Sequence, residues 1–245
     1  MEYEIFPRAP IAEAILEIIA NLPETVVVED LVQFPQEIRN RFSRTVKKME
    51  LKSAFKLAEN VTVLPSHERI IGYQLHSDED KKVIQSRLDG FAFSKLRPYE
   101  SWEKFRTEAR EIWTNYCAIT KPLKIVRISL RYVNRIEIPT QIKDFNEYIL
   151  TNPNIAPGLP QGVSEFFMRL EIPEPSINGG AIVTLTIDNV KSPEILPLIF
   201  DIDVIRQQNY EKDMEKIWDD FEELHNFKND IFFKSLTEKA KELFR

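Results

Sequence analysis

The chain has 245 residues, 43% of them apolar, which is enough to bury one large core or two smaller ones. Its 33 basic and 39 acidic residues give a net charge of −6, so the protein as a whole repels nucleic acid and anionic membrane surfaces. One cysteine excludes an internal disulfide, and six glycines argue against a glycine-rich phosphate loop. With no apolar run of about 20 residues and no basic leader, the sequence predicts a cytoplasmic protein that does not bind a membrane.

The first part of the chain alternates between strand and helix patterns. Residues 11–19 follow a proline and predict a strand. After Pro35, apolar residues recur every three or four positions as far as Met49, which predicts an amphipathic helix of about four turns. Alternation at 53–64 and 69–76 predicts two half-buried antiparallel strands.

A predicted strand at 88–93 leads into the clearest helix of the sequence. Gly90, in the middle of this strand, predicts a bulge or the close approach of another backbone. From Glu100 onward the apolar residues follow a helical period: Trp102, Phe105, Ala109, Ile112, Trp113 and Tyr116. We therefore expect a core helix that packs against a sheet.

After Pro122 the chain begins a second series of elements. These are a long strand at 125–138, a short helix at 144–150, a loop at 152–162, strands at 166–172, 181–188 and 196–205, and a helix at 211–234. Thr237 is predicted to cap a final short helix.

The fold class that we predict is α+β, with mainly antiparallel sheets and long amphipathic helices. Residues 1–120 and 121–245 share the order strand, helix, three strands, long helix, which predicts an internal duplication packed as one globular unit. Joining the two sheets edge to edge, within one chain or in a dimer, would cover the edge that each half leaves open.

A polar face is predicted on the sheet of the second half. Side-chain alternation places these residues on one side of it: Arg127, Arg131, Arg135, Arg169, Asp201 and Asp203. The arginines could bind phosphate or carboxylate, and the two aspartates could hold Mg²⁺ or act as an acid and base pair. The matching charge signs favour cross-strand ion pairs without a ligand, which is the interpretation we adopt.

A basic patch is predicted on the helix after Pro35. Its members are Arg39, Arg41, Arg44, Lys47 and Lys48. The patch could contact nucleic acid or an acidic partner, or it could be a solvated helix face. No aromatic residue interleaves with it, so we expect no binding of nucleic acid.

Motifs that carry chemistry are missing from the sequence. The three histidines do not have the spacing of metal ligands, and there is no GxSxG, P-loop or GxGxxG motif. The sequence therefore predicts no catalytic residue, no metal site and no cofactor.

The C-terminal segment is rich in apolar residues. Phe232 and Phe233 are adjacent, so on a helix they point about 100° apart and cannot both lie at the centre of one stripe. A second copy of the chain would cover the remaining ring, which predicts a homodimer. The alternative is that the chain bends at Ser235 and folds its last helix back over both rings.

Several segments together resemble a known family. They are API-x-EA at 9–14, DGFAFSKLRPYESWEKF-x-x-EA at 89–109, LRYVNRIEIP at 130–139, FDID at 200–203, ELH at 223–225 and FF-x-x-LTEKAKELF at 232–244. This pattern is similar to a sporadically distributed family of uncharacterised prokaryotic proteins of similar length. The resemblance covers nearly the whole chain and implies no activity, but the patchy distribution of the family implies a defence or toxin–antitoxin module.

These observations predict a non-enzymatic cytoplasmic binding or adaptor protein with a protein partner, belonging to such a module. Two alternatives stay open. The order of four antiparallel strands, a long helix and a short one resembles the cytoplasmic export chaperone, which implies a holdase. Asp201 and Asp203 would instead serve a metal-dependent enzyme if a third ligand lay beside them.

Overall fold

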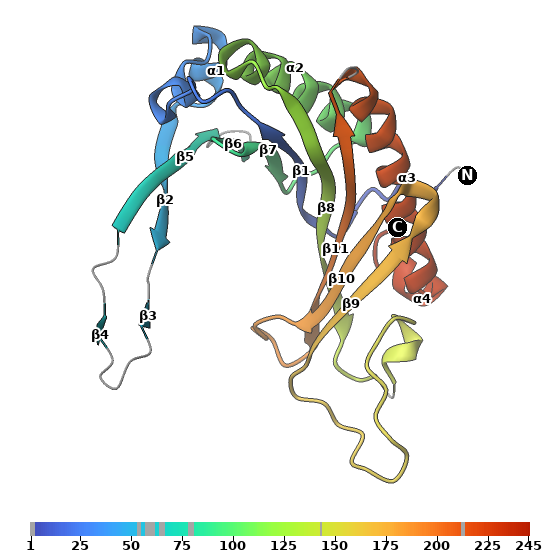
Figure 1. The fold of residues 1–245 in the computed structure, drawn as a ribbon. Helices are drawn as coiled ribbons and strands as arrows, with labels where there is room; N and C mark the ends of the chain where they lie inside the picture. The colour runs from blue at the N-terminus through green and yellow to red at the C-terminus, as the bar shows by residue number, and fades with distance from the viewer. Residues whose placement is uncertain are drawn as a thin grey trace.

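The computed structural model describes residues 3–52, 55–56, 62–63, 67–77, 81–142, 144–211 and 214–245. Within these residues, nine antiparallel strands form one sheet in the order β2-β5-β6-β7-β1-β8-β11-β10-β9. The sheet curves into an arch, and the helices lie on its outer, convex side (Figure 1). The fold is therefore α+β with an antiparallel sheet, as the sequence predicts.

Strands and helices alternate along the chain. The strands of the sheet are β1 (Ile11–Asn21), β2 (Arg44–Lys52), β5 (His67–Ser77), β6 (Lys82–Arg87), β7 (Gly90–Leu96), β8 (Lys124–Pro139), β9 (Phe167–Glu174), β10 (Gly179–Ile187) and β11 (Ile195–Tyr210). The α-helices are α1 (Gln36–Arg41), α2 (Trp102–Thr120), α3 (Ile217–Ser235) and α4 (Glu238–Lys241). A separate pair of short strands is formed by β3 (Phe55–Lys56) and β4 (Thr62–Val63).

Strand pairing divides the sheet at its centre. β1 lies next to β7, with β6 and then β5 further out, while β8 lies next to β11, with β10 and then β9 further out. In each series, the strand that comes first in the sequence pairs with the strand that comes last: β1 pairs with β7, and β8 pairs with β11. β1 and β8 join the two series as antiparallel neighbours, with Leu16 opposite Leu130. β2 adds one strand beyond β5.

The core lies between the convex side of the sheet and the helices. Every second residue of the central strands faces this core, because side chains alternate along a strand. Buried examples are Leu16, Ile18, Ile128, Leu130 and Tyr132. Phe91 of β7 packs against Trp113 of α2, with ring centroids 5.7 Å apart, and Phe200 of β11 packs against Phe232 of α3 at 6.4 Å. Among the described residues, the helices therefore cover one side of the sheet.

Several expected elements are confirmed. β1, β8, β9, β10 and α2 occur where the sequence patterns predict them, within a few residues. β11 and α3 are also present, but β11 continues to Tyr210 and α3 begins at Ile217 instead of at residue 211. Thr237 caps α4, because its Oγ1 accepts a hydrogen bond from Ala240 N at 3.2 Å. Gly90 has a φ of +146°, and a Cβ at this position would lie 2.2 Å from Ile18 O, so the close backbone approach is confirmed.

The helix predicted after Pro35 is wrong in its extent. α1 ends at Arg41, and the chain continues as β2. Ile38 is buried, as a helical stripe requires, but Met49 is 47% exposed. The reason is tertiary: β2 pairs with β5, and this ladder overrides the local helical period.

Two further differences concern smaller elements. The sequence patterns do not predict β6 as a strand of its own. Phe145–Glu147 form one turn of 3₁₀ helix where a short α-helix is expected. Most of the strand predicted at 53–64 lies outside the described residues.

In the described part of the chain, no helix combines the length and the apolar composition needed to cross a membrane.

Candidate functional site

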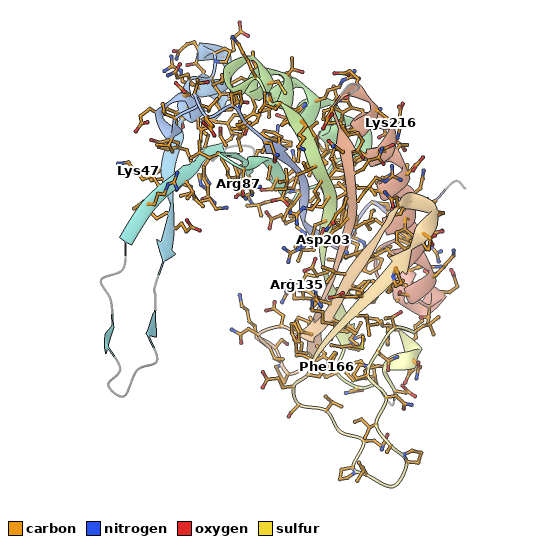
Figure 2. The ribbon with its side chains drawn as sticks, in the orientation of Figure 1. Lys47, Arg87, Arg135, Phe166, Asp203 and Lys216 are labelled. Carbon is orange, nitrogen blue, oxygen red and sulfur yellow. The ribbon has the colours of Figure 1, made fainter. Side chains whose placement is uncertain are left out.

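The concave side of the arch carries the polar face predicted from the sequence. Arg87, Asp203 and Arg135 lie along this inner side, whereas Lys47 lies on the outside of the arch (Figure 2). The helices of the described chain lie on the opposite side of the sheet (Figure 1). This face is therefore the solvated side of an antiparallel sheet.

Arg131 of β8 and Asp201 of β11 form a bidentate ion pair on this face. Arg131 Nε donates to Asp201 Oδ1 at 2.9 Å, and Arg131 Nη2 donates to Asp201 Oδ2 at 2.6 Å. In the register of the two strands Arg131 lies opposite Asp203, so the pair is a diagonal one. One carboxylate thus occupies the guanidinium that a phosphate ligand would need.

Asp203 lies beside this pair but is left out of it. Its Oδ1 is buried and accepts no hydrogen bond from the described residues. Burial raises the pKa of Asp203 to about 6, an effect that the charge of Arg131 opposes and the charge of Asp201 reinforces. A metal site would need a third ligand, and among the described residues no three His, Cys, Asp or Glu side chains come together as such a site requires.

The other arginines of the face also have carboxylate partners. Glu17 of β1 lies between two of them: Arg87 Nη2 is 2.8 Å from Glu17 Oε1, and Arg127 pairs with the other oxygen. Arg135 Nε lies 3.0 Å from Asp188 Oδ2. These contacts support the interpretation as ion pairs without a ligand.

Arg169, at the outer edge of the sheet, also has a carboxylate partner. It forms an ion pair with Glu171 two residues along β9. The structure therefore brings the predicted residues of β8, β9 and β11 onto one side of the sheet, where carboxylates balance the arginines.

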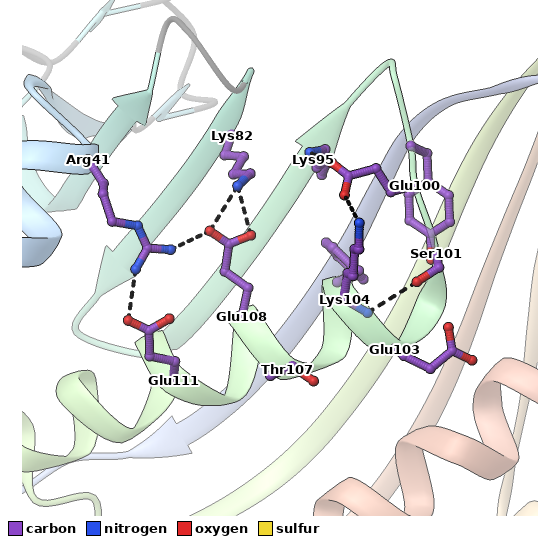
Figure 3. Close-up of a pocket in the computed structure, with 12 residues that line it drawn as sticks. Arg41, Lys82, Lys95, Glu100, Ser101, Glu103, Lys104, Thr107, Glu108 and Glu111 are labelled. Atoms are coloured by element: carbon purple, nitrogen blue, oxygen red, sulfur yellow. Dashed lines mark hydrogen bonds and ion pairs between the residues drawn. The ribbon is translucent and has the colours of Figure 1, made fainter.

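The predicted basic patch is divided between two elements. Arg39 and Arg41 lie on α1, and Arg44, Lys47 and Lys48 lie on β2. Arg41 lines a pocket of about 490 Å³ beside α2, where its guanidinium pairs with Glu108 at 2.5 Å and with Glu111 at 2.8 Å (Figure 3). Lys82 Nζ also pairs with Glu108 in this pocket, at 3.0 Å (Figure 3). The pocket is a network of balanced charges rather than a basic surface.

Phe232 and Phe233 are both covered within the chain. Phe232 is 7% exposed and stacks on Phe200 of the sheet. Phe233 stacks on Tyr3 and Phe6 of the N-terminal segment, with ring centroids 5.0 and 5.6 Å apart. The chain turns after α3, and α4 packs back beside these rings, as the alternative to a dimer describes. The homodimer stays a prediction without support from these two rings.

A larger cavity lies on the convex side, between the N-terminal segment, the start of α2, β8 and α3. Its volume is about 650 Å³. The N-terminal segment is held over it by contacts with the C-terminal helices: Tyr3 OH donates to Asp230 Oδ1 at 2.6 Å, and Arg8 N donates to Phe244 O at 3.1 Å. The side chains that decide its chemistry are Tyr99, Trp102, Tyr132, Asn134, His225 and Lys228.

Lys228 is the most unusual group of this cavity. Its residue is 6% exposed, and its Nζ lies 4.0 Å from the centroid of the Tyr132 ring, which stabilises a cation. The Nζ also donates a hydrogen bond to Asn229 Oδ1. No carboxylate of the described residues forms an ion pair with it, and burial lowers the pKa of Lys228 to about 7. The ammonium group is thus buried without a counter-ion from the described chain.

His225 lies one helical turn before Asn229. Its ring stacks on Trp102 with centroids 4.5 Å apart and an interplanar angle of 7°. Its Nε2 lies 3.4 Å from Asn229 Nδ2. Burial, together with the charges of Lys228 and Arg106, lowers the pKa of His225 to about 3. The imidazole is therefore neutral, and the ring acts as part of the aromatic wall.

Asn134 supplies a second polar group with an unused atom. It is 2% exposed, and its Nδ2 donates to Phe200 O at 3.0 Å and to Tyr132 O at 3.3 Å. Both partners are carbonyl oxygens, so the amide nitrogen must face them. The Oδ1 is left without a donor among the described residues. Nearby, the hydroxyl oxygens of Tyr99 and Tyr132 are 2.7 Å apart.

The sequence contains one signal for this cavity. Residues 97–102, Tyr132, Asn134 and His225 line it, and all of them belong to the pattern on which the family resemblance rests. No pattern in the sequence connects His225 with Trp102. The sequence does not indicate that Lys228 is buried in a cavity, because a lysine on a charged helix is ordinarily solvated.

Comparison with known proteins adds no assignment. The chain matches no protein-family model, no curated protein and no solved structure.

Proposed function

We propose that the protein is a binding protein and that the cavity between the N-terminal segment, α2, β8 and α3 is its ligand site. The observation that carries this proposal is the pair Asn134 and Lys228, two buried polar groups that line one cavity of about 650 Å³ with hydrogen-bonding capacity unused by the described chain. Lys228 Nζ has Asn229 as one partner, and Asn134 Oδ1 is not among the buried unpartnered atoms of the described residues. A ligand that accepts a hydrogen bond from Lys228 and donates one to Asn134 would gain free energy from both contacts.

The walls of the cavity fit a small organic molecule. Aromatic rings line it from four parts of the chain: Phe6, Tyr99, Trp102, Tyr132, Phe232 and Phe233. Cavities with a mainly apolar wall and a few buried polar groups are typical of sites for small molecules. Flat rings favour a ligand with a flat apolar body, because stacked or edge-on contacts add to area burial.

This proposal keeps the predicted adaptor role. A ligand in the cavity touches the N-terminal segment, so its binding can report to a protein partner. The resemblance to a prokaryotic family, the defence or toxin–antitoxin module, the cytoplasmic location and the partner itself remain predictions from the sequence.

The two alternatives receive less support from the geometry. For a metal-dependent enzyme, Arg131 already engages Asp201 through two hydrogen bonds. For a holdase, the concave side would have to present apolar surface, and it carries the ion pairs of Glu17 and Asp201 at its centre.

We also infer that residues 1–120 and 121–245 arose by internal duplication. In the series β1-β7-β6-β5 and β8-β11-β10-β9, the strand that comes first in the sequence is followed in the sheet by the other three in reverse sequence order. Each series is followed along the chain by a 19-residue helix, α2 or α3. An experimental structure in which the two ranges share no common core of strands and helix on superposition would contradict this inference.

The ligand site can be tested with a neutral aromatic probe. N-phenylnaphthylamine, which fluoresces in apolar surroundings, is expected to bind saturably, with one site per chain. Asn226→Trp places a large ring at the cavity and is expected to weaken binding by about tenfold or more. The matched control is Thr114→Trp on the exposed side of α2, which should leave binding unchanged. No saturable binding, or equal binding by Asn226→Trp, would reject the site.

A further inference from the structure

The cavity has a charge asymmetry that identifies a class of ligand. Lys228 contributes an ammonium group with three N–H donors, of which Asn229 Oδ1 accepts one. The face of Tyr132 lies against the same group at 4.0 Å. A tyrosine face attracts a cation but does not neutralise it. When the amine is protonated, the cavity therefore holds a positive charge with capacity for an anion.

The carboxylates that line the cavity do not meet this need. Glu4 pairs with Arg245 at 2.7 Å, and Glu222 with Arg106 at 2.8 Å. Glu100 pairs with Lys95 at 2.8 Å, and Glu103 is exposed to solvent. In the described part of the chain, none of these four carboxylates forms an ion pair with the buried ammonium group.

We propose, building on the ligand site proposed above, that the ligand is a small organic anion whose acidic group ion-pairs with Lys228 while its flat apolar body lies against the aromatic wall. A buried charge is costly unless it is paired, so an anion gains more from this cavity than a neutral molecule of the same shape does. The Oδ1 of Asn134 provides a second contact for a hydroxyl or amino group of the ligand.

The ring of Trp102 and the neutral imidazole of His225 complete the recognition. They are stacked 4.5 Å apart and present a rigid double layer at the cavity wall. Because the imidazole carries no charge, Lys228 is the buried cation of the described cavity wall. The proposal therefore predicts that removal of one amine abolishes the preference for anions while the apolar site remains.

The experiment uses two probes of nearly the same shape. Anilinonaphthalene sulfonate carries an anionic group, and N-phenylnaphthylamine lacks it. Lys228→Met is expected to weaken binding of the anionic probe by about tenfold or more and to change binding of the neutral probe by less than about threefold. Lys234→Met, on the exposed side of the same helix, is the matched control and should change neither.

The outcomes separate this inference from the proposed function. If the neutral probe fails to bind the wild-type protein, the ligand site itself is rejected. If the neutral probe binds but Lys228→Met affects both probes equally, or affects neither, the anion inference is overturned and the ligand site stands. Preferential loss of the anionic probe supports both.

A second measurement covers the case in which Lys228→Met does not fold. Calorimetric titration of the wild-type protein at about pH 8.5, in two buffers of different ionisation enthalpy, detects proton uptake on binding. The anionic probe is expected to cause uptake, because it stabilises the protonated amine, whereas the neutral probe is not. The groups facing the amine are the phenol of Tyr132 on β8 and, on its own helix, His225, whose pKa lies far below this pH. Equal or no uptake with both probes would contradict the inference.

Discussion

Lys228 illustrates how one buried side chain sets the pH dependence of stability. Its folded pKa of about 7 lies below the ordinary lysine value of 10.5. Between these values the unfolded chain binds a proton that the folded protein lacks, so the free energy of unfolding rises with pH across this window. Below pH 7 the cost of burying the charged amine is fully present.

We therefore expect Lys228→Met to raise the free energy of unfolding at pH 7 by about 2–4 kcal/mol and to flatten its rise toward pH 10. Urea unfolding followed by tryptophan fluorescence at several pH values measures both effects. Lys234→Met, whose amine pairs with Asp230 at the surface, should have an effect below about 0.5 kcal/mol. If the wild-type and Lys228→Met proteins had equal free energies of unfolding at pH 7, the burial of the Lys228 amine would be contradicted.

Asp201 and Asp203 differ in environment although they share one strand and one side of the sheet. Asp201 pairs with Arg131, whereas the pKa of Asp203 is raised from its ordinary 3.8 to about 6. Between these two values the folded protein binds the extra proton, so the contribution of Asp203 to stability falls as pH rises and is lowest above pH 6.

Asp203→Asn is accordingly expected to raise the free energy of unfolding by about 1 kcal/mol at pH 7.5, because it removes a buried charge. Asp201→Asn should lower it by about 1 kcal/mol, because Arg131 loses its bidentate partner. Asp219→Asn, at an exposed position of α3, serves as the control. If Asp203→Asn and Asp201→Asn changed the free energy of unfolding in the same direction, the different environments of the two carboxylates would be contradicted.

At the scale of elements, the pairing of β1 with β7 depends on one glycine. Gly90 lies opposite Ile19 in the register, with a φ of +146°, and a Cβ there would meet Ile18 O at 2.2 Å. Neither the backbone conformation nor the space accepts a side chain. Gly90→Ala should therefore destabilise the protein by about 3 kcal/mol or more.

A matched glycine gives the comparison. Gly162 lies in a loop, and a Cβ there would meet no heavy atom within 4 Å. Gly162→Ala is expected to change stability by less than about 0.5 kcal/mol. Thermal unfolding by circular dichroism compares the two variants, and similar melting temperatures would refute the close approach of β1 to β7.

At the scale of the whole molecule, the two ends of the chain lie together. Tyr3 and Phe6 stack on Phe233, and Glu4 pairs with Arg245 at 2.7 Å. The N-terminal segment, which forms one wall of the cavity, is therefore held by the C-terminal helices. A charged side chain at position 233 would therefore weaken the stacking of Tyr3 and Phe6 on this position within the same chain.

Phe233→Glu is expected to lower the free energy of unfolding by about 2–3 kcal/mol and to leave the oligomeric mass unchanged. Light scattering measures the mass against 28.8 kDa for one chain, and urea unfolding measures the stability. Ile5→Glu, at a residue of the same segment that is 90% exposed, should change neither. A doubled wild-type mass that halves in Phe233→Glu would instead restore the dimer surface at this ring.

Local patterns determined the elements that bury one continuous side. Ile128, Leu130 and Tyr132 alternate along β8, and the apolar stripe of α2 repeats every three or four residues, so strand and helix can be identified without knowledge of their partners. The polar face of β8 follows from the same alternation. The cap at Thr237 and the close approach at Gly90 follow from single residues whose conformational preferences are strong.

Tertiary structure alone decided the rest. β2 follows a helical period in sequence but forms a strand, because its pairing with β5 depends on residues far along the chain. The cavity joins side chains of residues 97–102 with those of Tyr132 and Asn134 on β8 and of His225 and Lys228 on α3, which no local pattern connects. Lys228 has the sequence context of a surface lysine, and only the packing of α3 over Tyr132 removes its amine from water and leaves it without a counter-ion.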